Sequence, residues 1–304
     1  MIKRVIEISQ EPLHLAVELD QLRLHRRPPE SGVLASVPCE DIGLVIVDHA
    51  ETTYSHAALA RLLEFGAAVV ICDRRHLPSG LLLPLGNHTE GVSRLQEQID
   101  ASRPLLKRLW KQVVQAKVRN QAANLVEDSP GRRRLLALAG EVKSGDPANV
   151  EAQAAKIYWA EWLGSGSGFR RDFDGGDGVN AQLNYGYAVV RAAVGRALVS
   201  AGLHPALGIH HCNRANAFCL ADDMVEPLRP FVDRAVRELQ QAGQQALNPE
   251  TKRKLLGLLT GTVRVGGQTG PLMVALHGMA ASLVHCYQGR EKRLIFPQER
   301  GQEA

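Results

Sequence analysis

The sequence predicts an α+β protein in which a small N-terminal β-sheet domain, residues 1–86, precedes a larger all-helical C-terminal domain, residues 87–304. Three observations support this division. Short β-branched or alternating apolar runs fill the first 85 residues, Pro and Gly interrupt the chain between 78 and 86, and apolar residues then recur at helical spacing. The charge changes at the same place, from 8 Lys+Arg against 11 Asp+Glu to 28 against 21. The basic C-terminal part favours phosphate-bearing ligands.

The N-terminal domain is predicted to contain four strands and one helix. Residues 13–19 alternate apolar and polar side chains, which is the period of a half-buried strand. Residues 4–8, 43–47 and 67–72 are short apolar or β-branched runs, typical of buried strands. Apolar residues at helical spacing over 52–65 predict the helix.

The C-terminal domain is predicted to begin with a long helix over about 92–125 whose solvent face is basic. Between residues 101 and 143, ten Lys and Arg stand against three acids. A solvated surface and a track for a phosphate backbone explain this excess equally well, and Arg103, Lys107 and Lys111 are the candidate DNA contacts. Further helices are predicted over 147–163, 179–201, 218–241, 249–259 and 272–288.

A glycine-rich connector covers residues 164–178. It is not a phosphate-binding loop, because no Gly-Lys-Ser/Thr follows, and a helix rather than a strand precedes it, which excludes a dinucleotide fingerprint. We expect a mobile connector. The alternative is that Arg170 and Arg171 bind a phosphate and order the segment.

Composition excludes several classes of protein. With 45 % hydrophobic and 22 % charged residues, the chain is an ordinary globular protein and not a disordered, collagen-like or coiled-coil one. Apolar runs fall short of the roughly 18–20 residues that span a bilayer, so no membrane partner is expected. Five cysteines without a Cys-x-x-Cys pair argue against a disulfide framework. These features indicate a reducing cytoplasm.

The first candidate site residue is Glu151. Asp146 and Pro147 are predicted to open the helix that carries it, since Asp accepts hydrogen bonds from free amides and Pro is tolerated in the first turn. Helical geometry puts Glu151 at the edge of the apolar stripe, where a carboxylate needs a cationic partner. A structural salt bridge and a metal ion both satisfy this requirement.

A second group of candidates follows a loop with turn residues at every third position, Gly202, Pro205 and Gly208. This loop presents the imidazoles of His210 and His211. The helix after it carries further acids. Asp222 is followed by Asp223 and Glu226, which lie about 60° apart on one helical face and repel each other unless a positive charge lies between them.

Histidine with two or three carboxylates suits Mg²⁺ or Mn²⁺ better than zinc. A zinc site made of His210, His211, Cys212 and Cys219 is an alternative without a familiar ligand spacing. A hard divalent ion in a basic helical domain indicates phosphodiester chemistry, because such an ion binds the scissile phosphate and offsets developing charge.

Four ordered blocks of the sequence resemble the Cas1 family, the CRISPR-associated integrases of spacer acquisition. They cover residues 72–85, 145–159, 180–187 and 202–230. In the last block, the stretches Asn-Ala-Phe, Leu-Ala-Asp-Asp and Glu-Pro-Leu-Arg-Pro are similar to the type II branch.

The resemblance implies that Glu151, His211 and Glu226 are catalytic residues that bind Mg²⁺ or Mn²⁺. His211 rather than His210 completes the Gly-x-x-Pro-x-x-Gly-x-x-His spacing, and Glu226 is the acid directly before Pro227. Asp223 would then contact the ligands without binding the ion, or bind the ion occasionally, and His210 would be a further residue in contact with the ligands.

The resemblance also implies a reaction and partners. A prespacer 3′-hydroxyl attacks a phosphodiester at the edge of a CRISPR repeat, once on each strand. The family forms homodimers that flank a small Cas2 dimer in a heterohexamer and hold double-stranded DNA, and other type II adaptation proteins are further candidate partners. Two alternatives remain from the residues alone: a metal-dependent nuclease that acts on branched DNA in repair, and a catalytically silent DNA-binding scaffold.

Overall fold

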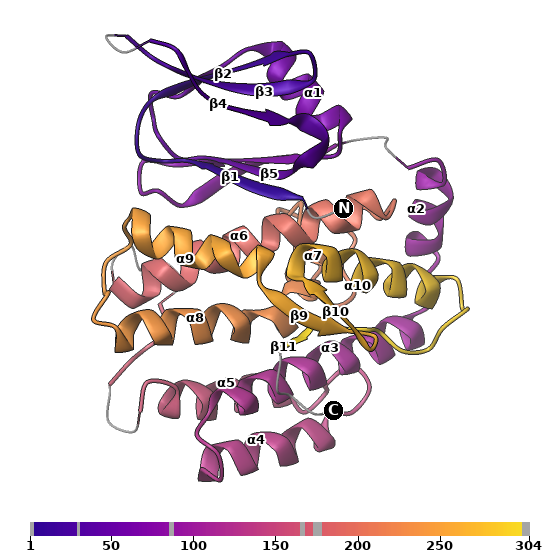
Figure 1. Cartoon of the computed structure of the whole chain (residues 1–304). Coiled ribbons are helices and arrows are strands. Elements are labelled where there is room, and N and C mark those ends of the chain that lie inside the picture. Colours follow the sequence, from indigo (N-terminus) through magenta and orange to yellow (C-terminus); the bar gives the residue numbers. More distant parts are fainter. Residues whose placement is uncertain (1–2, 29–30, 85–87, 165–167, 173–177, 300–304) are drawn as a thin grey trace.

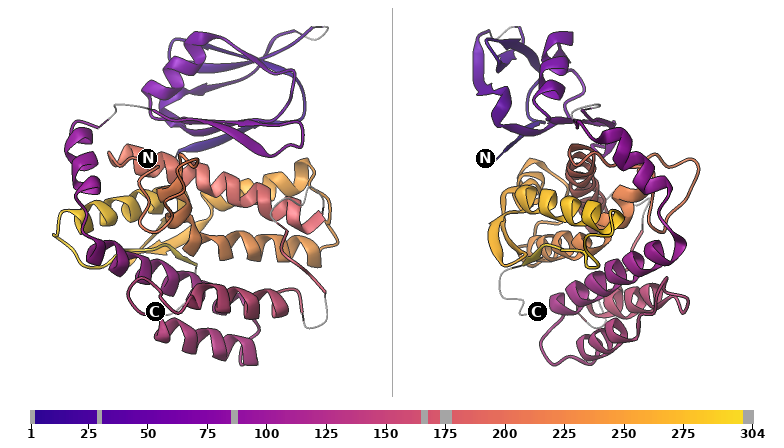
Figure 2. Two further views of the ribbon diagram at one scale, coloured as in Figure 1. Left: turned by 180° about the vertical axis from the view of Figure 1, so that it is seen from behind. Right: turned by 90° about the vertical axis from the view of Figure 1, so that its right-hand side faces the viewer.

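The computed structural model describes residues 3–28, 31–84, 88–164, 168–172 and 178–299. The N-terminal strands form a layered unit that lies against one side of a larger helical region (Figures 1 and 2). No helix within these ranges is long and apolar enough to cross a membrane.

Two four-stranded sheets build the N-terminal unit. In the first, ordered β1-β5-β7-β8, the first three strands are parallel and β8 is antiparallel. The second sheet is ordered β4-β3-β2-β6, and α1 packs between the two sheets against β2 and β7. The bounds are β1 Arg4–Ile8, β2 Leu13–Glu18, β3 Gln21–Arg26, β4 Val33–Pro38, η1 Cys39–Asp41, β5 Ile42–Val47, β6 Thr53–Tyr54, α1 His56–Glu64, β7 Ala68–Cys72 and β8 Pro78–Leu82.

Strand β5 connects the two hydrophobic cores of the molecule. All six of its residues are buried, and alternate side chains point to opposite faces. Leu44 and Ile46 belong to the core of the helical region, whereas Val45 and Val47 belong to the core between the two sheets. The first sheet is therefore covered on both faces.

The helical region is arranged around α6, which packs against α7, α8, α9 and α10 and against β7 and β8. The second organising helix is α3, which contacts α4, α5, α8 and η2. The bounds are α2 Gly91–Ile99, α3 Arg103–Asn124, α4 Pro130–Glu141, α5 Val150–Glu161, α6 Gly178–Ser200, α7 Cys219–Val225, η2 Glu226–Leu228, α8 Arg229–Gln241, α9 Pro249–Thr260 and α10 Leu272–Tyr287.

Two predicted helices are interrupted. The helix predicted over 92–125 divides into α2 and α3, because the Ser102 hydroxyl accepts the Leu105 amide and starts a new helix with Pro104 in its first turn. The helix predicted over 218–241 divides into α7, η2 and α8, because Pro227 has no amide to donate to the preceding turn.

The C-terminal part is mainly helical rather than all-helical. Strands β9 (Thr262–Val265), β10 (Gln268–Pro271) and β11 (Gln298–Glu299) form a small sheet ordered β10-β9-β11. Gly266 and Gly267 join β9 to β10 with positive φ angles of 53° and 83°, the conformation of a two-residue hairpin turn. The α+β class is confirmed, with this sheet as an addition.

We predict that Gly186→Ala destabilises the protein. A Cβ at this position would lie 2.4 Å from Val232 Cγ1, at the contact between α6 and α8. Overpacking of this kind costs about 1–3 kcal/mol, against a helix-propensity gain of about 1 kcal/mol. A denaturant titration should therefore show a net loss of up to about 2 kcal/mol in the free energy of unfolding. The matched control is Gly278→Ala in α10, where a Cβ meets nothing within 4 Å; equal stability changes in the two variants would contradict the prediction.

Candidate active site

Glu151 lies in the first turn of α5, and Asp146 holds the start of that helix. The Asp146 carboxylate accepts the amides of Val150 at 2.9 Å and Glu151 at 3.0 Å. Pro147 was predicted to open the helix, but α5 begins at Val150. The residue before it, Asn149, has a φ of 51°, so the chain makes a left-handed turn before α5 starts.

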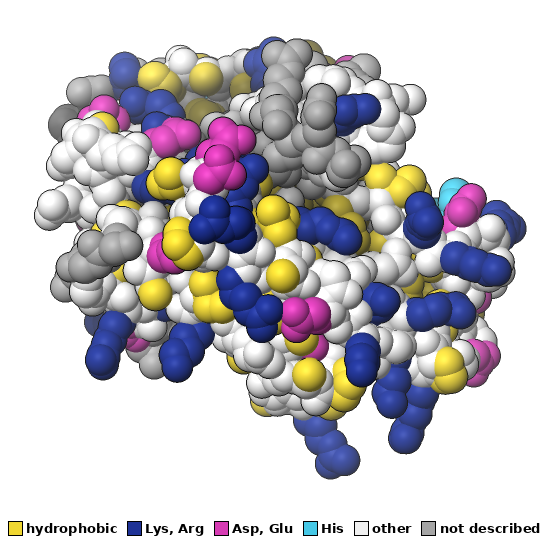
Figure 3. Space-filling model, turned by 90° about the horizontal axis from the view of Figure 1, so that it is seen from below, with side chains coloured by type: hydrophobic (Ala, Val, Ile, Leu, Met, Phe, Trp, Pro, Cys, Tyr) yellow, Lys and Arg dark blue, Asp and Glu magenta, His cyan; other side chains and the backbone are white. Residues whose placement is uncertain are grey.

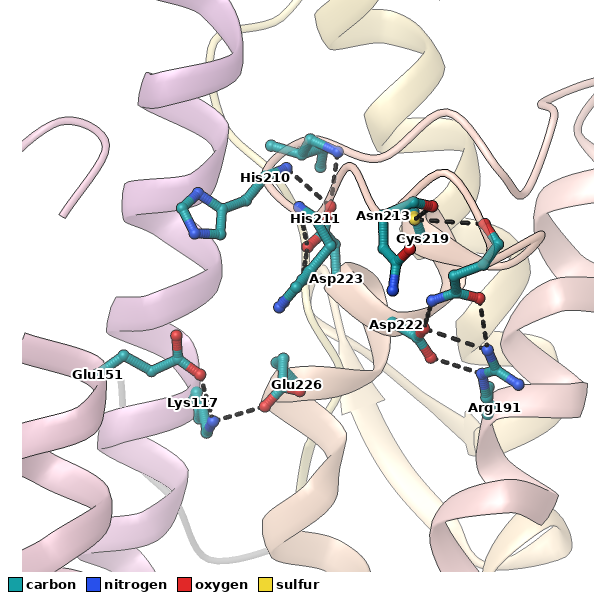
Figure 4. Close-up of polar contacts among 12 residues, drawn as sticks. Lys117, Glu151, Arg191, His210, His211, Asn213, Cys219, Asp222, Asp223 and Glu226 are labelled. Atoms are coloured by element: carbon teal, nitrogen blue, oxygen red, sulfur yellow. Dashed lines mark hydrogen bonds and ion pairs between the residues drawn. The ribbon is translucent and has the colours of Figure 1, made fainter. Parts of the chain in front are cut away.

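Lys117 of α3 lies between two of the predicted site carboxylates (Figure 4). Its Nζ is 2.6 Å from Glu151 Oε1 and 2.5 Å from Glu226 Oε2. The Lys117 side chain is only 11 % exposed. Burial alone would lower the pKa of Lys117, but Glu226 and Glu151 raise it above its usual value. The cation that Glu151 was expected to need is therefore an ammonium group.

Glu226 is buried in η2 and has a second cationic partner. Arg229 Nε donates to Glu226 Oε1 at 2.8 Å. Burial by itself would raise the pKa of Glu226, but Arg229 and Lys117 lower it to about 2. This carboxyl is ionised at every physiological pH.

Asparagines of α3 hold the segment around Glu226 in place. Asn120 Nδ2 donates to the Pro227 carbonyl at 2.7 Å, and Asn124 Nδ2 donates to the Pro230 carbonyl at 2.6 Å. Both asparagines are buried. They pair the carbonyl of Pro227 in η2 and the carbonyl of Pro230 in the first turn of α8, so these acceptors are satisfied where the helix is interrupted at Glu226.

A hydrogen bond to the buried Asp223 carboxylate orients the His211 ring. Asp223 has no exposed surface, and its Oδ2 accepts the amides of Ile209 at 2.6 Å and His210 at 2.9 Å. Its Oδ1 lies 2.5 Å from His211 Nδ1. This hydrogen bond is the main cause that raises the pKa of His211 above its usual value. With Nδ1 bonded to Asp223, Nε2 is the ring nitrogen that can bind a ligand.

Gly208 explains the spacing of the loop. A Cβ at Gly208 would lie 2.1 Å from the His211 carbonyl oxygen and 3.0 Å from Asp223 Oδ2. Only glycine lets the loop backbone fold this closely over the buried carboxylate. His210 then turns away from the acids and stacks on Trp110, with ring centroids 4.2 Å apart and planes 5° apart.

The acids Asp222, Asp223 and Glu226, which follow the histidine loop, each have different partners. Asp222 pairs with Arg191 at 2.5 Å, Asp223 with His211, and Glu226 with Lys117 and Arg229. The expected repulsion between Asp223 and Glu226 is thus relieved by separate partners. The zinc alternative has no support in the geometry, because the Cys219 thiol contacts the carbonyls of Asn213 and Asn216.

A cavity of about 190 Å³ lies beside the ion pairs, lined among others by Lys117, Glu151, Trp159, Arg171, Arg229 and Asp233. Arg171 reaches it because Asn180 Oδ1 and Asn184 Oδ1 accept its guanidinium hydrogen bonds at 3.0 and 2.5 Å. Arg170 is exposed on the same connector. The predicted mobility of the connector falls largely on residues 165–167 and 173–177, which lie outside the described residues.

Asp233 also lines this cavity and is only 1 % exposed. Burial raises its pKa to about 7, although the hydroxyls of Tyr187 and Tyr158 donate hydrogen bonds to it. Arg229 lies over the Tyr187 ring, 4.6 Å from the centroid. The cavity lining therefore combines the cations Lys117, Arg171 and Arg229 with an acid that is already hydrogen-bonded.

The predicted DNA contacts on α3 lie on one side of the helix, four residues apart. Arg103 and Lys107 are exposed and Lys111 is half-buried. Lys and Arg side chains are spread over the face of the molecule that carries α3, α4 and α5, and they outnumber the acids there (Figure 3). Neither this surface nor the Arg170 side chain contacts the carboxylate pair.

A family model for CRISPR associated protein Cas1 matches residues 7–260. The chain belongs to the Cas1 family. It is 39 % identical over 271 residues to the CRISPR-associated endonuclease Cas1 of Neisseria meningitidis serogroup C, covering 86 % of this chain and 87 % of that relative. The family inferred from the sequence is confirmed.

Solved structures share the Cas1 fold with this chain. A casposase bound to integration product superposes with a TM-score of 0.78 and 20 % identity over 96 % of this chain and 92 % of that one. A chain of a Cas6-RT-Cas1–Cas2 complex gives 0.73 and 18 % identity over 95 % of this chain and 35 % of that one. A CAS1 protein from Thermotoga maritima gives 0.76 and 18 % identity over 99 % and 100 %.

Sequence reasoning missed the inward-facing cations of this Cas1-family site. In the sequence, Lys117 is one of the ten basic residues between 101 and 143, and Arg229 is part of the Glu-Pro-Leu-Arg-Pro stretch. A signal was present for Lys117, because it falls in the apolar stripe of α3 together with Val113, Val114 and Val118, all of which are buried. A lysine in such a stripe needs a buried acid.

We predict that Asp223→Asn lowers the pKa of His211, because it removes the anion that stabilises the imidazolium. NMR titration of the histidine ring protons should place the wild-type pKa above 6.5 and the variant value nearer to it. Since folding raises this pKa, the charged His211 stabilises the fold fully below about pH 6.5, and this contribution is lost as the pH rises through the raised pKa. An unchanged His211 pKa in the variant would contradict this.

Proposed function

We propose that this protein is a metal-dependent DNA integrase and endonuclease of the adaptation stage of CRISPR immunity. The observation that carries the proposal is the pair of carboxylates, Glu151 and Glu226, that lies on either side of Lys117 beside a cavity also lined by Arg171 and Arg229. His211, bonded to Asp223, is near enough for both carboxylates to contribute to its raised pKa. Membership of a family whose relatives are named endonucleases supports it, as does the likeness to a casposase bound to integration product.

The donor set fits a hard divalent ion. Two carboxylates that already enclose a cation, and an imidazole nitrogen oriented by a buried acid, are ligands that Mg²⁺ and Mn²⁺ accept. Glu151, His211 and Glu226 would hold the ion, which when bound neutralises charge on the scissile phosphate and activates the attacking hydroxyl.

The chain's own residues position the DNA. Arg171 and Arg229 at the cavity are suited to bind the scissile phosphate, since guanidinium groups match phosphate oxygens in pairs. Asp223 keeps the His211 ring in one orientation. In the reaction the prespacer 3′-hydroxyl loses its proton as its oxygen bonds to the phosphorus at the 5′ edge of the repeat. The bond from that phosphorus to the 3′-oxygen of the flanking DNA breaks, and this oxygen takes up a proton and leaves as a 3′-hydroxyl.

The proposed assembly follows from the family and from the charge division. The acidic β domain, residues 1–86, would form the homodimer and contact a Cas2 dimer in a heterohexamer, and the basic helical domain, residues 87–304, would hold prespacer and repeat duplexes. The solved Cas6-RT-Cas1–Cas2 complex supports the Cas2 partner. Other type II adaptation proteins remain candidate partners. Five free cysteines are consistent with a cytoplasmic location.

We predict that Glu226→Gln reduces strand transfer by roughly a hundredfold or more, because it removes a negatively charged ligand while keeping the side-chain shape. The assay follows joined products from labelled prespacer and repeat-bearing DNA with Mn²⁺, Mg²⁺ or EDTA, in the presence of the Cas2 partner. Glu127→Gln, at an exposed acid between α3 and α4, is the matched control and should react like the wild type.

The products decide between the proposal and its alternatives. Metal-dependent joined strands that disappear in Glu226→Gln support an integrase. Shortened strands without joining would indicate a repair nuclease, and duplex binding without any reaction would indicate a silent scaffold.

We also predict that replacing Arg103, Lys107 and Lys111 together with Ala weakens duplex binding and its salt dependence. Each lost phosphate contact should make the slope of log affinity against log salt shallower by about 0.9, so about 3 in total. Fluorescence anisotropy at several NaCl concentrations measures this. A double Arg74→Ala/Arg75→Ala variant in the β domain should keep the wild-type slope, and an unchanged slope in the triple variant would exclude α3 as the DNA contact.

A further inference from the structure

Lys117 occupies the place between Glu151 and Glu226 in which two carboxylates would enclose a metal ion. Its ammonium contacts one oxygen of each, at 2.6 and 2.5 Å, and the three groups come from three different elements, α3, α5 and η2. Among the described residues, no three His, Cys, Asp or Glu side chains are grouped as ligands of one ion. The carboxylates are thus held together by a side-chain cation.

We propose that Lys117 competes with the divalent ion for Glu151 and Glu226, and that DNA phosphate relieves this competition. The inference rests on the proposed function, because it requires the two carboxylates to be metal ligands. An ammonium and a divalent cation repel each other strongly at contact distance in a buried site. The Lys117 ammonium must therefore withdraw before both carboxylates bind the ion.

The surroundings determine where the ammonium goes. The lysine side chain is long and flexible, and the adjacent cavity of about 190 Å³ gives it room. The other charged groups on that cavity are Arg171 and Arg229, which are cations, and Asp233, which already accepts hydrogen bonds from Tyr158 and Tyr187.

A withdrawn ammonium in this cavity needs an anion, since an unpaired buried charge is unfavourable. The cavity supplies none beyond Asp233, and a DNA phosphate bound by the two arginines provides one. Metal and DNA binding are then coupled through Lys117: the metal ion frees the ammonium for the phosphate, and the phosphate stabilises it away from the carboxylates.

The first experiment measures Mn²⁺ affinity of the full-length protein without DNA, by electron paramagnetic resonance and calorimetry. Lys117→Met should bind Mn²⁺ roughly tenfold or more tightly than the wild type, because a charge-assisted contact no longer has to break. Lys156→Met removes an exposed lysine from the helix of Glu151 and controls for a general loss of positive charge. Its affinity should stay within about twofold of the wild type.

Glu226→Gln separates this inference from the proposed function. If the wild type binds Mn²⁺, Glu226→Gln loses it, and Lys117→Met binds equally or more weakly, the competition is disproved while the metal site stands. If none of the variants binds Mn²⁺ with or without DNA, the metal site itself is disproved and the competition with it.

Lys117→Gln covers the case in which Lys117→Met does not fold, because its amide can still donate hydrogen bonds to the carboxylates. Circular dichroism establishes folding. The rise in Tm on adding Mn²⁺ should be larger in Lys117→Gln than in the wild type, and an equal or smaller rise would overturn the competition.

The second experiment tests the coupling with a duplex that carries 3′-dideoxy ends, so that no strand transfer occurs. Adding this duplex should tighten Mn²⁺ binding to the wild type by several-fold and should have a smaller effect on Lys117→Met. The same enhancement in both proteins would show that the phosphate acts on the ion directly and not through Lys117.

Discussion

The candidate site depends on one constraint: buried carboxylates must have cationic partners. Glu151 and Glu226 are separated in sequence by the rest of α5 and by the whole of α6 and α7, and Lys117 contacts both of them. Without its two cationic partners, burial would favour the protonated form of Glu226, whereas Arg229 and Lys117 together lower its pKa to about 2. The packing of α3, α5 and η2 is therefore fixed by charge as well as by apolar contact.

The fold isolates this charge network from the β domain. Strand β5 gives its Leu44 face to the helical core and its Val45 face to the core between the sheets. A substitution that disturbs the packing of one core therefore also affects the other core. Both cores pack against β5, which is buried on both faces and paired with a strand on each edge. The β domain, for which the dimer and partner contacts are proposed, is therefore packed rigidly against the helical region.

Much of the fold and of the site could be predicted from the sequence, and the remainder shows where local patterns fail. Alternation predicted the strand over 13–19, but Leu19 is 85 % exposed and has a φ of 49°. It forms the hairpin turn to β3 with Asp20, which also has positive φ, so the glycine that normally marks such a turn is missing. Glu151 and His211 are candidates from the sequence because a polar residue at the edge of an apolar stripe, or one that completes a spacing, can be recognised locally. The sequence does not show that Lys117 is buried, because its burial depends on Glu151 and Glu226, which are distant from it in sequence.

Helix α3 shows how a single element positions chemistry that other segments supply. Trp110, Lys117 and Asn124 follow one another at seven-residue intervals, so they lie along one line of the helix, about 10 Å apart. Trp110 stacks on His210, Lys117 binds Glu151 and Glu226, and Asn124 holds the Pro230 carbonyl. The loop with His210, the acids Glu151 and Glu226 and the segment around Pro230 are thus all positioned by contacts with α3. Basic residues on the exposed face of the same helix are the proposed DNA contacts, so a duplex bound there is aligned with the site by α3 itself. Because α3 contacts the ligand-bearing segments and carries the proposed DNA contacts, the positions of the ligands and of the duplex do not depend on the loops alone. The site can therefore tolerate variation in the loops.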